Sequence, residues 1–487
     1  MLWKAGVISL VLLLASRLLG VAREAAQAAA FGVSGAADVA VLMLTLPDWL
    51  TGLLASGALS YVLLPHWARQ TPVEQAVTQR RVAMALLVGG GALALSIILL
   101  QRPIALLLMK GLPEAFQGMA GSGLIWAALA LPVSLLGALW GTRLQNEHDL
   151  PGMYAGSLVV NGGIIFALLI LAGGANAALD QAINWLGLAL LISMLSRLAW
   201  LRWRLWRVST ATGISELRPG AVASLPGWRI WFWAILASGL PLALPFVARS
   251  LASSTGEGSL ASFNYAWKLV ELPLILVVQL VASLTFPKIS RAFAERRNPA
   301  EFVRNAFVLT WTLACAATAA LLVGAPAIAQ LMFGWGRMEQ DAVMRIANWS
   351  MVGAWSLLPQ ALTAVGLTVL AVKNQMHAAV AAYFTGLLVL LLVGFLGWSQ
   401  GPQLMMVLNG VQIGVALVVI VVMRSGGADS DEWLPWRLLA PPFLVLMLVV
   451  ALACRFSDQG ASMLFWSVLA ASSVMLVSWP LRNALRR

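Results

Sequence analysis

The sequence predicts an all-α polytopic membrane protein with about fourteen transmembrane helices, each of about 20 residues. Two observations support this fold class, one on composition and one on the distribution of apolar residues. Hydrophobic residues make up 61% of the 487-residue chain and charged residues only 10%, whereas soluble domains average about 45–50% apolar and about 25% charged residues. Apolar runs long enough to cross a bilayer also recur from one end of the chain to the other.

The expected spans follow one another with short connections, and their boundaries follow the apolar runs. In chain order they cover residues 5–30, 38–64, 82–100, 121–143, 154–173, 182–201, 230–250, 262–286, 306–332, 343–370, 378–398, 403–423, 436–454 and 462–481.

A short pattern repeats in the two halves of the chain. Val21-Ala22-Arg23 precedes Leu46-Pro47, and Val247-Ala248-Arg249 precedes Leu272-Pro273 at the same spacing. The repeat predicts two six-helix lobes related by a parallel pseudo-two-fold axis, a design in which substrates bind between the repeats.

A long polar segment separates the two expected lobes, and two further spans follow the second lobe. We therefore expect an N-terminal lobe, a basic cytoplasmic linker, a C-terminal lobe and two extra helices, at residues 1–201, 202–229, 230–423 and 424–487.

The net charge of +12 reflects topology. Lysines and arginines gather in the loops after even-numbered spans and in the tail, which predicts cytoplasmic termini because such loops stay inside. These residues also favour contact with anionic membrane lipids. No basic block interleaves with aromatic residues as a nucleic-acid surface would. The opposite loops hold Arg102, Lys110, Arg249, Arg337, Arg345 and Arg455.

Several site classes lack support in the sequence. The first span continues into arginines and a second span, so we do not expect a cleavable signal peptide. Cys315 and Cys454 both lie in apolar spans, which is typical of buried small hydrophobes. The histidines at positions 66, 148 and 377 are scattered, and neither an H-E-x-x-H nor a phosphate-binding G-x-x-x-x-G-K-[ST] motif occurs. We predict no catalytic residues, no metal and no cofactor.

Arg17 and Arg23 lie inside the first expected span. Charges at membrane depth usually face a protein interior or a wet cavity. The two positions diverge by about 120° on a straight helix, so both face one cavity only if the helix bends, for instance at Gly20. Otherwise one lines the cavity and the other holds a neighbouring helix. The structural alternative is an arginine that is paired in the bundle or reaches the interface.

Two further expected spans carry polar groups. In span two, Asp48 shares a face with small and polar residues, which favours a wet surface over simple close packing. In span eight, Asn264, Lys268 and Glu271 lie within about 60° of one face, and Asn264 is opposite Asp38 in the repeat. Lys268 and Glu271 are also spaced to pair with each other.

A cavity lined by Arg17, Arg23 and Lys268 would attract an anion, since guanidinium groups suit phosphate. These residues also carry a resemblance. The run from Ser16 to Glu24, with Phe31-Gly32 and Ala36-Ala37-Asp38, resembles the opening signature of the MurJ/MviN family of lipid II flippases. Further matches are Leu46-Pro47, Ser56-Gly57-Ala58-Leu59-Ser60, Pro65, Leu144-Gln145-Asn146, Leu150-Pro151, Asn161, Phe263-Asn264-Tyr265-Ala266, Glu271-Leu272-Pro273, Phe286-Pro287-Lys288-Ile289-Ser290, Phe333-Gly334-Trp335-Gly336-Arg337 and Asp341-Ala342.

The resemblance implies the multidrug/oligosaccharidyl-lipid/polysaccharide exporter superfamily, with two six-helix lobes and two added C-terminal helices. It matches Arg17 and Arg23 to the family's cavity arginines and Asp38 to a family aspartate. Two positions depart from the family pattern. Thr51-Gly52 stands where the family has an arginine in span two, and Trp267-Lys268 replaces Asp-Arg in span eight.

The leading hypothesis is a flippase for a polyprenyl-pyrophosphate-linked saccharide, either a lipid II-like peptidoglycan precursor or an exopolysaccharide repeat unit, in the bacterial inner membrane. Alternating access would carry the cargo across. The cations at 17, 23 and 268 would hold the pyrophosphate. Asp38, Asp48 and Glu271 would tune or couple binding, with a coupling ion or the membrane potential as the drive.

Two alternatives remain open at this point. A multidrug or cation antiporter of the same superfamily would usually carry positive substrates, which a cationic cavity does not favour. A polytopic enzyme that acts on lipid-linked sugars would need acid/base or nucleophilic groups in a large outer loop, and the expected outer loops are short.

Overall fold

The computed structural model describes residues 2–53, 58–173, 178–211, 225–295, 298–373, 375–425, 433–453 and 462–477. Within these ranges the regular structure consists of helices, and no strand occurs. The all-α fold class is confirmed.

The chain forms two compact units. Unit 1 comprises Met1–Ala261 and Trp335–Met338, and unit 2 comprises Ser262–Gly334 and Glu339–Arg487. The lobe boundaries expected from the sequence, with a second lobe from residue 230, remain a prediction. The region 230–261, however, packs within unit 1.

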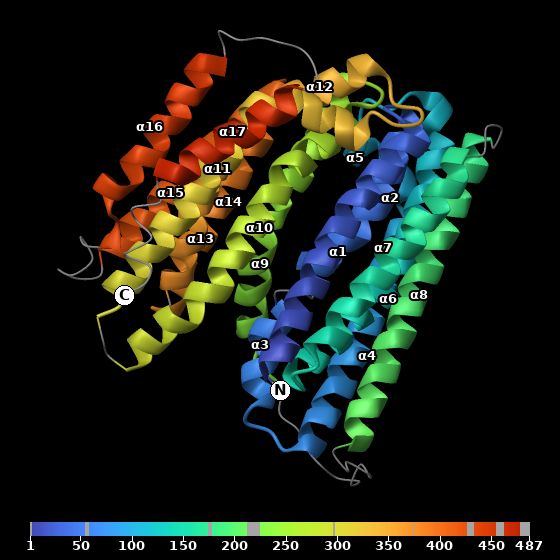
Figure 1. The fold of residues 1–487 in the computed structure, drawn as a ribbon. Helices are drawn as coiled ribbons and strands as arrows, with labels where there is room; N and C mark the ends of the chain where they lie inside the picture. The colour runs from blue at the N-terminus through green and yellow to red at the C-terminus, as the bar shows by residue number, and fades with distance from the viewer. Residues whose placement is uncertain are drawn as a thin grey trace. The chain divides into compact units, whose positions relative to one another are not determined.

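Unit 1 is a bundle in which α1 packs on α7, and α6 packs on α2, α4 and α8 (Figure 1). Apolar side chains in these helices are buried against one another, and glycines on α6 permit close approach: a methyl group at Gly123 would lie 2.8 Å from Val39 of α2. The helices are α1 (Leu2–Phe31), α2 (Gly35–Thr51), α3 (Ala58–Trp67), α4 (Pro72–Leu99), α5 (Gln101–Leu108), α6 (Gln117–Asn146), α7 (Leu150–Gly173), α8 (Leu179–Ala211) and α9 (Trp228–Ala252).

Local sequence sets where two of these helices begin. Ser34 caps α2 by accepting a hydrogen bond from the Ala37 N–H. Thr71 and Glu74 form a reciprocal capping box at the start of α4, and Pro72 occupies the first turn, where its missing N–H costs nothing. Both helix starts therefore follow from polar residues that satisfy otherwise unpaired backbone N–H groups.

The turn between α1 and α2 is in tight contact with the segment Trp335–Met338. The Arg337 N–H donates to the Ala29 carbonyl at 3.0 Å. Gly32 and Gly336 both have positive φ, at 61° and 62°, and the backbones leave no space for a side chain at either position. A Cβ at Gly32 would be 2.6 Å from the Arg337 carbonyl oxygen, and one at Gly336 would overlap the Ala29 carbonyl.

Helix α9 packs on α2, α3 and α5 within unit 1. Trp49 and Phe246 stack with their ring centroids 4.2 Å apart, and the Ser250 hydroxyl donates to the Leu108 carbonyl at 3.0 Å. These contacts explain why α9 belongs to unit 1.

Unit 2 contains α10 from Ser262 onward and all later helices. The loop segment Trp335–Met338 belongs to unit 1. The break between α12 and α13 bends that helix pair by 46° within the single span expected at 343–370. The helices are α10 (Ser259–Ala294), α11 (Ala300–Phe333), α12 (Gln340–Ala354), α13 (Leu357–Val372), α14 (Met376–Phe395), α15 (Gly401–Arg424), α16 (Trp436–Ala453) and α17 (Ser462–Val477).

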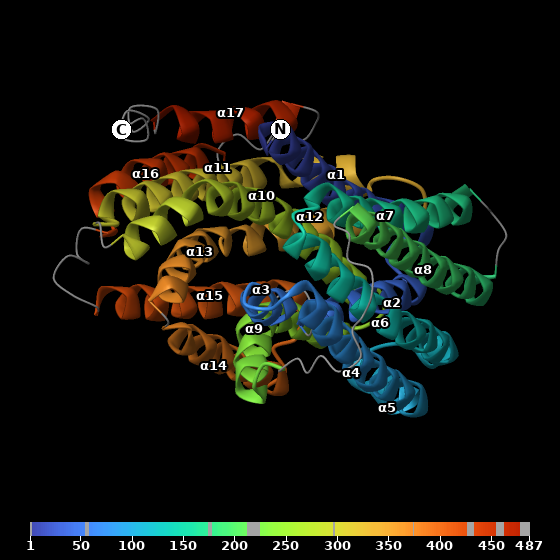
Figure 2. The same ribbon diagram turned by 90° about the horizontal axis from the view of Figure 1, so that it is seen from below.

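The two C-terminal helices pack against α11 in unit 2 (Figure 2). The Trp311 indole donates to the Leu439 carbonyl of α16, and the Ser467 hydroxyl of α17 donates to the Ala320 carbonyl. Cys315 is buried in the apolar cluster that these helices share, as expected. Cys454 lies outside the described residues.

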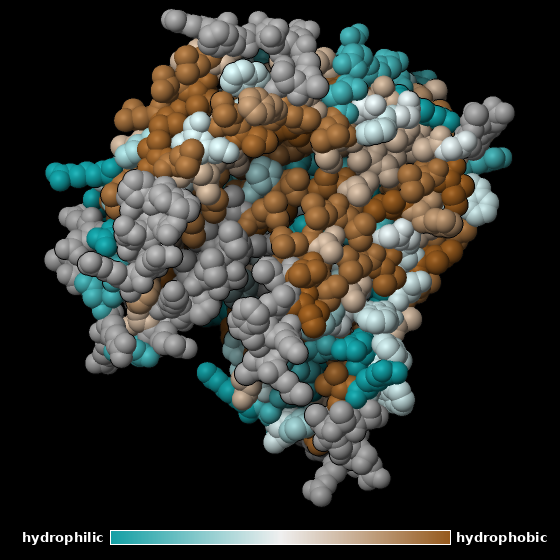
Figure 3. Space-filling view, viewed as in Figure 1, coloured by the Kyte–Doolittle hydropathy of each residue, from teal (hydrophilic) through white to brown (hydrophobic). Residues whose placement is uncertain are grey.

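Among the described residues, nine helices are long and apolar enough to cross a membrane, or up to ten if the bent pair is one span. The expected number of about fourteen remains a prediction. Helices α1, α2 with α3, α10 and α17 occupy the other four expected spans. Large hydrophobic side chains are exposed along the helices, such as Leu107 at 74% and Phe395 at 89%. Figure 3 shows hydrophobic residues over much of the visible face, as lipid contact requires.

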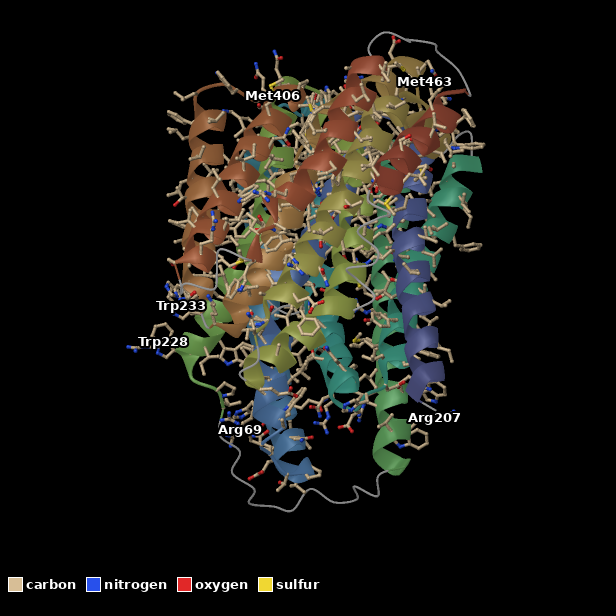
Figure 4. All side chains as sticks on the ribbon, turned by 60° about the vertical axis from the view of Figure 1, so that its left-hand side comes forward. Arg69, Arg207, Trp228, Trp233, Met406 and Met463 are labelled. Atoms are coloured by element: carbon tan, nitrogen blue, oxygen red, sulfur yellow. The ribbon has the colours of Figure 1, made fainter. Side chains whose placement is uncertain are left out.

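Helix α8 ends later than the span predicted at 182–201. It extends to Ala211, so residues 202–211 of the expected linker are helical, and residues 212–224 lie outside the described part. Arg204 stabilises this extension because it donates two hydrogen bonds to Asp149, at 2.7 and 2.9 Å. Figure 4 shows Arg69 and Arg207 in the lower part of the view.

Candidate functional site

A buried arginine on α1 forms the centre of the candidate site in unit 1. Arg23 is only 8% exposed. Its Nη2 lies 3.1 Å from Glu24 Oε1, and its Nη1 lies 3.2 Å from Asp48 Oδ2 on α2. A guanidinium this deep requires anionic partners, because an unpaired buried charge is costly. We call Arg23, Glu24 and Asp48 the Arg23 cluster.

The two carboxylates of the Arg23 cluster differ in exposure. The Glu24 side chain is 3% exposed, whereas that of Asp48 is 46% exposed. Asp48 follows Pro47 inside α2. The cluster therefore has one buried anion, Glu24, and one partly exposed anion, Asp48.

A second arginine lies inside the bundle of unit 1, Arg197 on α8, and sequence reasoning did not identify it. The Nε atom of Arg197 is buried and has no hydrogen-bond partner among the described residues. The Asp48 carboxylate attracts its charge. The signal was present in the sequence, since Arg197 falls inside the apolar span expected at 182–201.

Arg17 lies in a different environment from Arg23. It is exposed, while Arg23 is buried, as the roughly 120° divergence on a straight helix permits. Near it, the Asn161 amide of α7 donates to the Ser16 carbonyl at 3.4 Å. Within the described residues, no contact joins Arg17 to the Arg23 cluster.

Asp38 lies at the other end of α2 from Asp48, about 15 Å along the helix axis at 1.5 Å per residue. It is 2% exposed and accepts hydrogen bonds from the N–H groups of Gly258 and Ala261, at 2.8 and 2.7 Å. Glu257 in turn accepts from the Gly35 N–H at 2.8 Å. Asp38 therefore binds the chain segment that enters α10, and the structure does not bring it to the Arg23 cluster.

The span-eight residues lie on α10 in unit 2. Asn264 is fully buried. The predicted pairing of Lys268 with Glu271 is confirmed, with Nζ 2.7 Å from Oε2. Both side chains are about one quarter exposed, at 27% and 28%, so the pair is accessible although it is formed.

Thr51 occupies the position at which the family pattern has an arginine. Its hydroxyl lies 2.6 Å from the Ser134 hydroxyl on α6. The next residue, Gly52, caps α2 and donates its N–H to the Asp48 and Trp49 carbonyls. The polar face predicted for span two thus makes a neutral contact with α6 at this point.

Comparison with known proteins supports the same reading of the fold. A family model described as Lipid II flippase MurJ matches residues 27–468. The chain is similar to a solved lipid II flippase MurJ in an inward closed conformation, with TM-score 0.78, 15% identity, and coverage of 99% of this chain and 100% of that one.

Two other solved structures are more distant. An inward-facing MATE family multidrug resistance transporter of the MOP superfamily gives TM-score 0.62 at 15% identity, covering 92% of this chain and 99% of that one. A MOP superfamily transporter from Pyrococcus furiosus gives 0.53 at 16% identity, covering 92% and 96%. These likenesses concern the fold, whereas the family match spans nearly the whole chain. The chain therefore belongs to the lipid II flippase MurJ family.

Proposed function

We propose that this protein moves a polyprenyl-pyrophosphate-linked saccharide, with lipid II as the first candidate, across the bacterial inner membrane. The observation that carries the proposal is the Arg23 cluster. An arginine buried among transmembrane helices, held by one buried and one open carboxylate, is suited to exchange an internal anion for an external one.

The exchange follows from the chemistry of the groups. A guanidinium presents donors in a planar fork, and phosphate oxygens accept them in the same geometry as a carboxylate. When a diphosphate arrives, it replaces Asp48 at Nη1 of Arg23, while Glu24 keeps its contact with Nη2. Because Arg23 never loses all its partners, the cost of an unpaired buried charge is avoided at each stage.

Lys268 would supply a second cation. Its ammonium is a compact point charge and not a fork, so it would attract a phosphate without fixing its orientation. Glu271 already neutralises Lys268 at 2.7 Å, and it would leave this contact when the cargo binds. Arg17, which is exposed, would attract the anionic head group before it reaches Arg23.

Transport would proceed by alternating access, with the prenyl chain in lipid and the head group in the protein. The positive-inside pattern predicts that both termini are cytoplasmic. The membrane potential or a coupling ion would reset the carrier, since one charge moved through 100 mV changes the free energy by about 2.3 kcal/mol.

Complementation tests this function. In cells depleted of their own lipid II flippase, the native chain should restore growth and Arg23→Ala should not, although it is inserted at normal levels. Arg202→Ala is the matched control, because Arg202 is an exposed arginine on α8.

A native chain that is inserted but fails to rescue would exclude lipid II as the cargo. Loss of surface polysaccharide in a deletion strain would then identify an exopolysaccharide unit. If neither phenotype appears and the deletion only raises sensitivity to cationic drugs, the protein is an antiporter and the proposal is wrong.

A further inference from the structure

Arg197 on α8 is placed among glycines of two neighbouring helices. Its Cγ is 3.5 Å from where a Cβ at Gly156 of α7 would lie, and its Nε is 3.8 Å from the corresponding point at Gly137 of α6. A methyl group at either site would already be in van der Waals contact. Glycine at both positions therefore leaves room for the Arg197 side chain.

The guanidinium lacks the partners that a purely structural arginine would have. Its Nε is buried without a hydrogen-bond partner in the described part of the chain, and buried donors are normally paired. By contrast, Arg204, two turns further along α8, donates hydrogen bonds to both carboxylate oxygens of Asp149. Arg197 is not fully buried, so a ligand can reach it.

Asp48 connects Arg197 to the Arg23 cluster. This carboxylate accepts a hydrogen bond from Arg23 at 3.2 Å and also attracts Arg197. Asp48 is hydrogen-bonded to Arg23 alone, and it lies three residues before Thr51, whose contact with Ser134 of α6 is one turn from Gly137, beside Arg197. An anion with more than one acceptor group, such as a diphosphate, matches two guanidinium groups better than this single carboxylate does.

Arg197 also lies near Thr51, the position at which the family pattern has an arginine that this chain lacks. Thr51 contacts Ser134 on α6 at 2.6 Å, and Gly137, beside Arg197, lies one turn further on the same face of α6. Thr51 and Arg197 thus approach adjacent turns of one helix. A charge missing from α2 at position 51 is present nearby on α8.

We propose that Arg197 is a further binding residue for the diphosphate group, acting with Arg23 on either side of Asp48 and replacing the arginine that span two lacks. This inference rests on the proposed function and assigns the second guanidinium of its anion site. Arg23 binds one phosphate and Arg197 the other, and Asp48 is released from both.

The test measures binding of geranylgeranyl pyrophosphate to the purified full-length protein in detergent, with geranylgeraniol as the uncharged control probe. Arg197→Ala should weaken diphosphate binding about 10- to 100-fold, the range for a lost hydrogen bond to a charged group. It should leave geranylgeraniol binding unchanged. Arg197→Lys, which keeps the charge without the fork, should fall between Arg197→Ala and the native protein.

Arg202→Ala is the matched control, because it removes an exposed arginine from the same helix. It should bind the diphosphate as the native chain does. Thermal unfolding of each variant separates binding from folding: if Arg197→Ala does not fold, Arg197→Lys carries the test.

Rescue gives the sharpest outcome. Thr51→Arg, placed in the Arg197→Ala background, should recover most of the lost affinity because the new guanidinium faces the same part of α6. A folded double variant that binds no better than Arg197→Ala overturns the shared site.

The failures of the two proposals are distinguishable. If the native protein binds the diphosphate and Arg23→Ala does not, but Arg197→Ala binds normally, the assignment of Arg197 is wrong and the proposed function stands. If the native protein does not bind the diphosphate, the proposed function fails and this inference fails with it.

Discussion

Asp48 on α2 accepts a hydrogen bond from Arg23 on α1 at 3.2 Å, across 25 residues of sequence. The same carboxylate is nearly half exposed. It therefore neutralises a buried cation while its own side chain remains accessible, which is the property on which the proposed exchange depends.

Replacement of the open carboxylate should separate binding from transport. Asp48→Asn removes the anion that competes with cargo for Arg23, so diphosphate affinity should rise by about tenfold, the effect of about 1.4 kcal/mol. Transport should fall, because release would slow. Binding of geranylgeranyl pyrophosphate and complementation measure the two effects. Weaker binding by this variant would show that Asp48 positions Arg23 and does not compete with the ligand.

Replacement of the buried carboxylate should mainly affect stability. Glu24→Gln leaves the guanidinium of Arg23 with one anionic partner, and breaking a buried pair costs up to about 3–5 kcal/mol. The midpoint of thermal unfolding in detergent should decrease clearly. Glu301→Gln, at an exposed position in the first turn of α11, is the control and should leave the midpoint unchanged. Equal midpoints for Glu24→Gln and the native protein would contradict this role.

The bonds from Asp38 to the α10 entry segment predict a local effect. Asp38→Ala removes the acceptor of the Gly258 and Ala261 N–H groups, each bond to a charged group being worth about 1.5–3 kcal/mol. Amide hydrogen exchange at residues 256–261 should become faster. Asp38→Asn should preserve one bond and show a smaller change. Unchanged exchange in Asp38→Ala, with Asp180→Ala as reference, would mean that the segment is held by other contacts.

The span-eight cation predicts a dependence on side-chain shape. Lys268→Arg should keep the pairing with Glu271 and bind a diphosphate at least as well as the native chain, because the fork adds donors. Lys268→Ala should bind several-fold more weakly, since it leaves the Glu271 carboxylate to repel the anion. If both variants bind like the native protein, Lys268 does not contact the diphosphate.

The all-α membrane fold could be predicted because membrane spans are recognisable in a sequence by their length and hydropathy. The bend between α12 and α13 was not predicted, although Pro359 lies in the first turn of α13, a position where proline is tolerated because a new helix begins there. Helix α8 also continues to Ala211, past the span predicted at 182–201. Alternating Trp and Arg from residue 202 reads as a polar linker, but Asp149 is close enough in space to hold Arg204 in a continuing helix.

Sequence reasoning predicted the pair of Lys268 with Glu271, but it located the charges of the Arg23 cluster without their partners. Arg23 and Asp48 were recognised as charges at membrane depth, but the register between α1 and α2 that joins them is a tertiary property. Arg197 was missed because it lies five residues before the basic end of α8, where arginines usually report topology. Its position beside Gly137 and Gly156 and its buried Nε without a hydrogen-bond partner among the described residues distinguish it from them.

The contact of Gly32 and Gly336 with opposing carbonyls determines how freely these positions can vary. Neither site can accept even alanine without separating the two backbones. In a saturation library selected for function, both codons should therefore remain glycine, whereas exposed apolar positions on the neighbouring helices should vary among apolar residues. A screen of this kind would identify these two glycines as among the least tolerant positions in the chain, although neither has a side chain of its own.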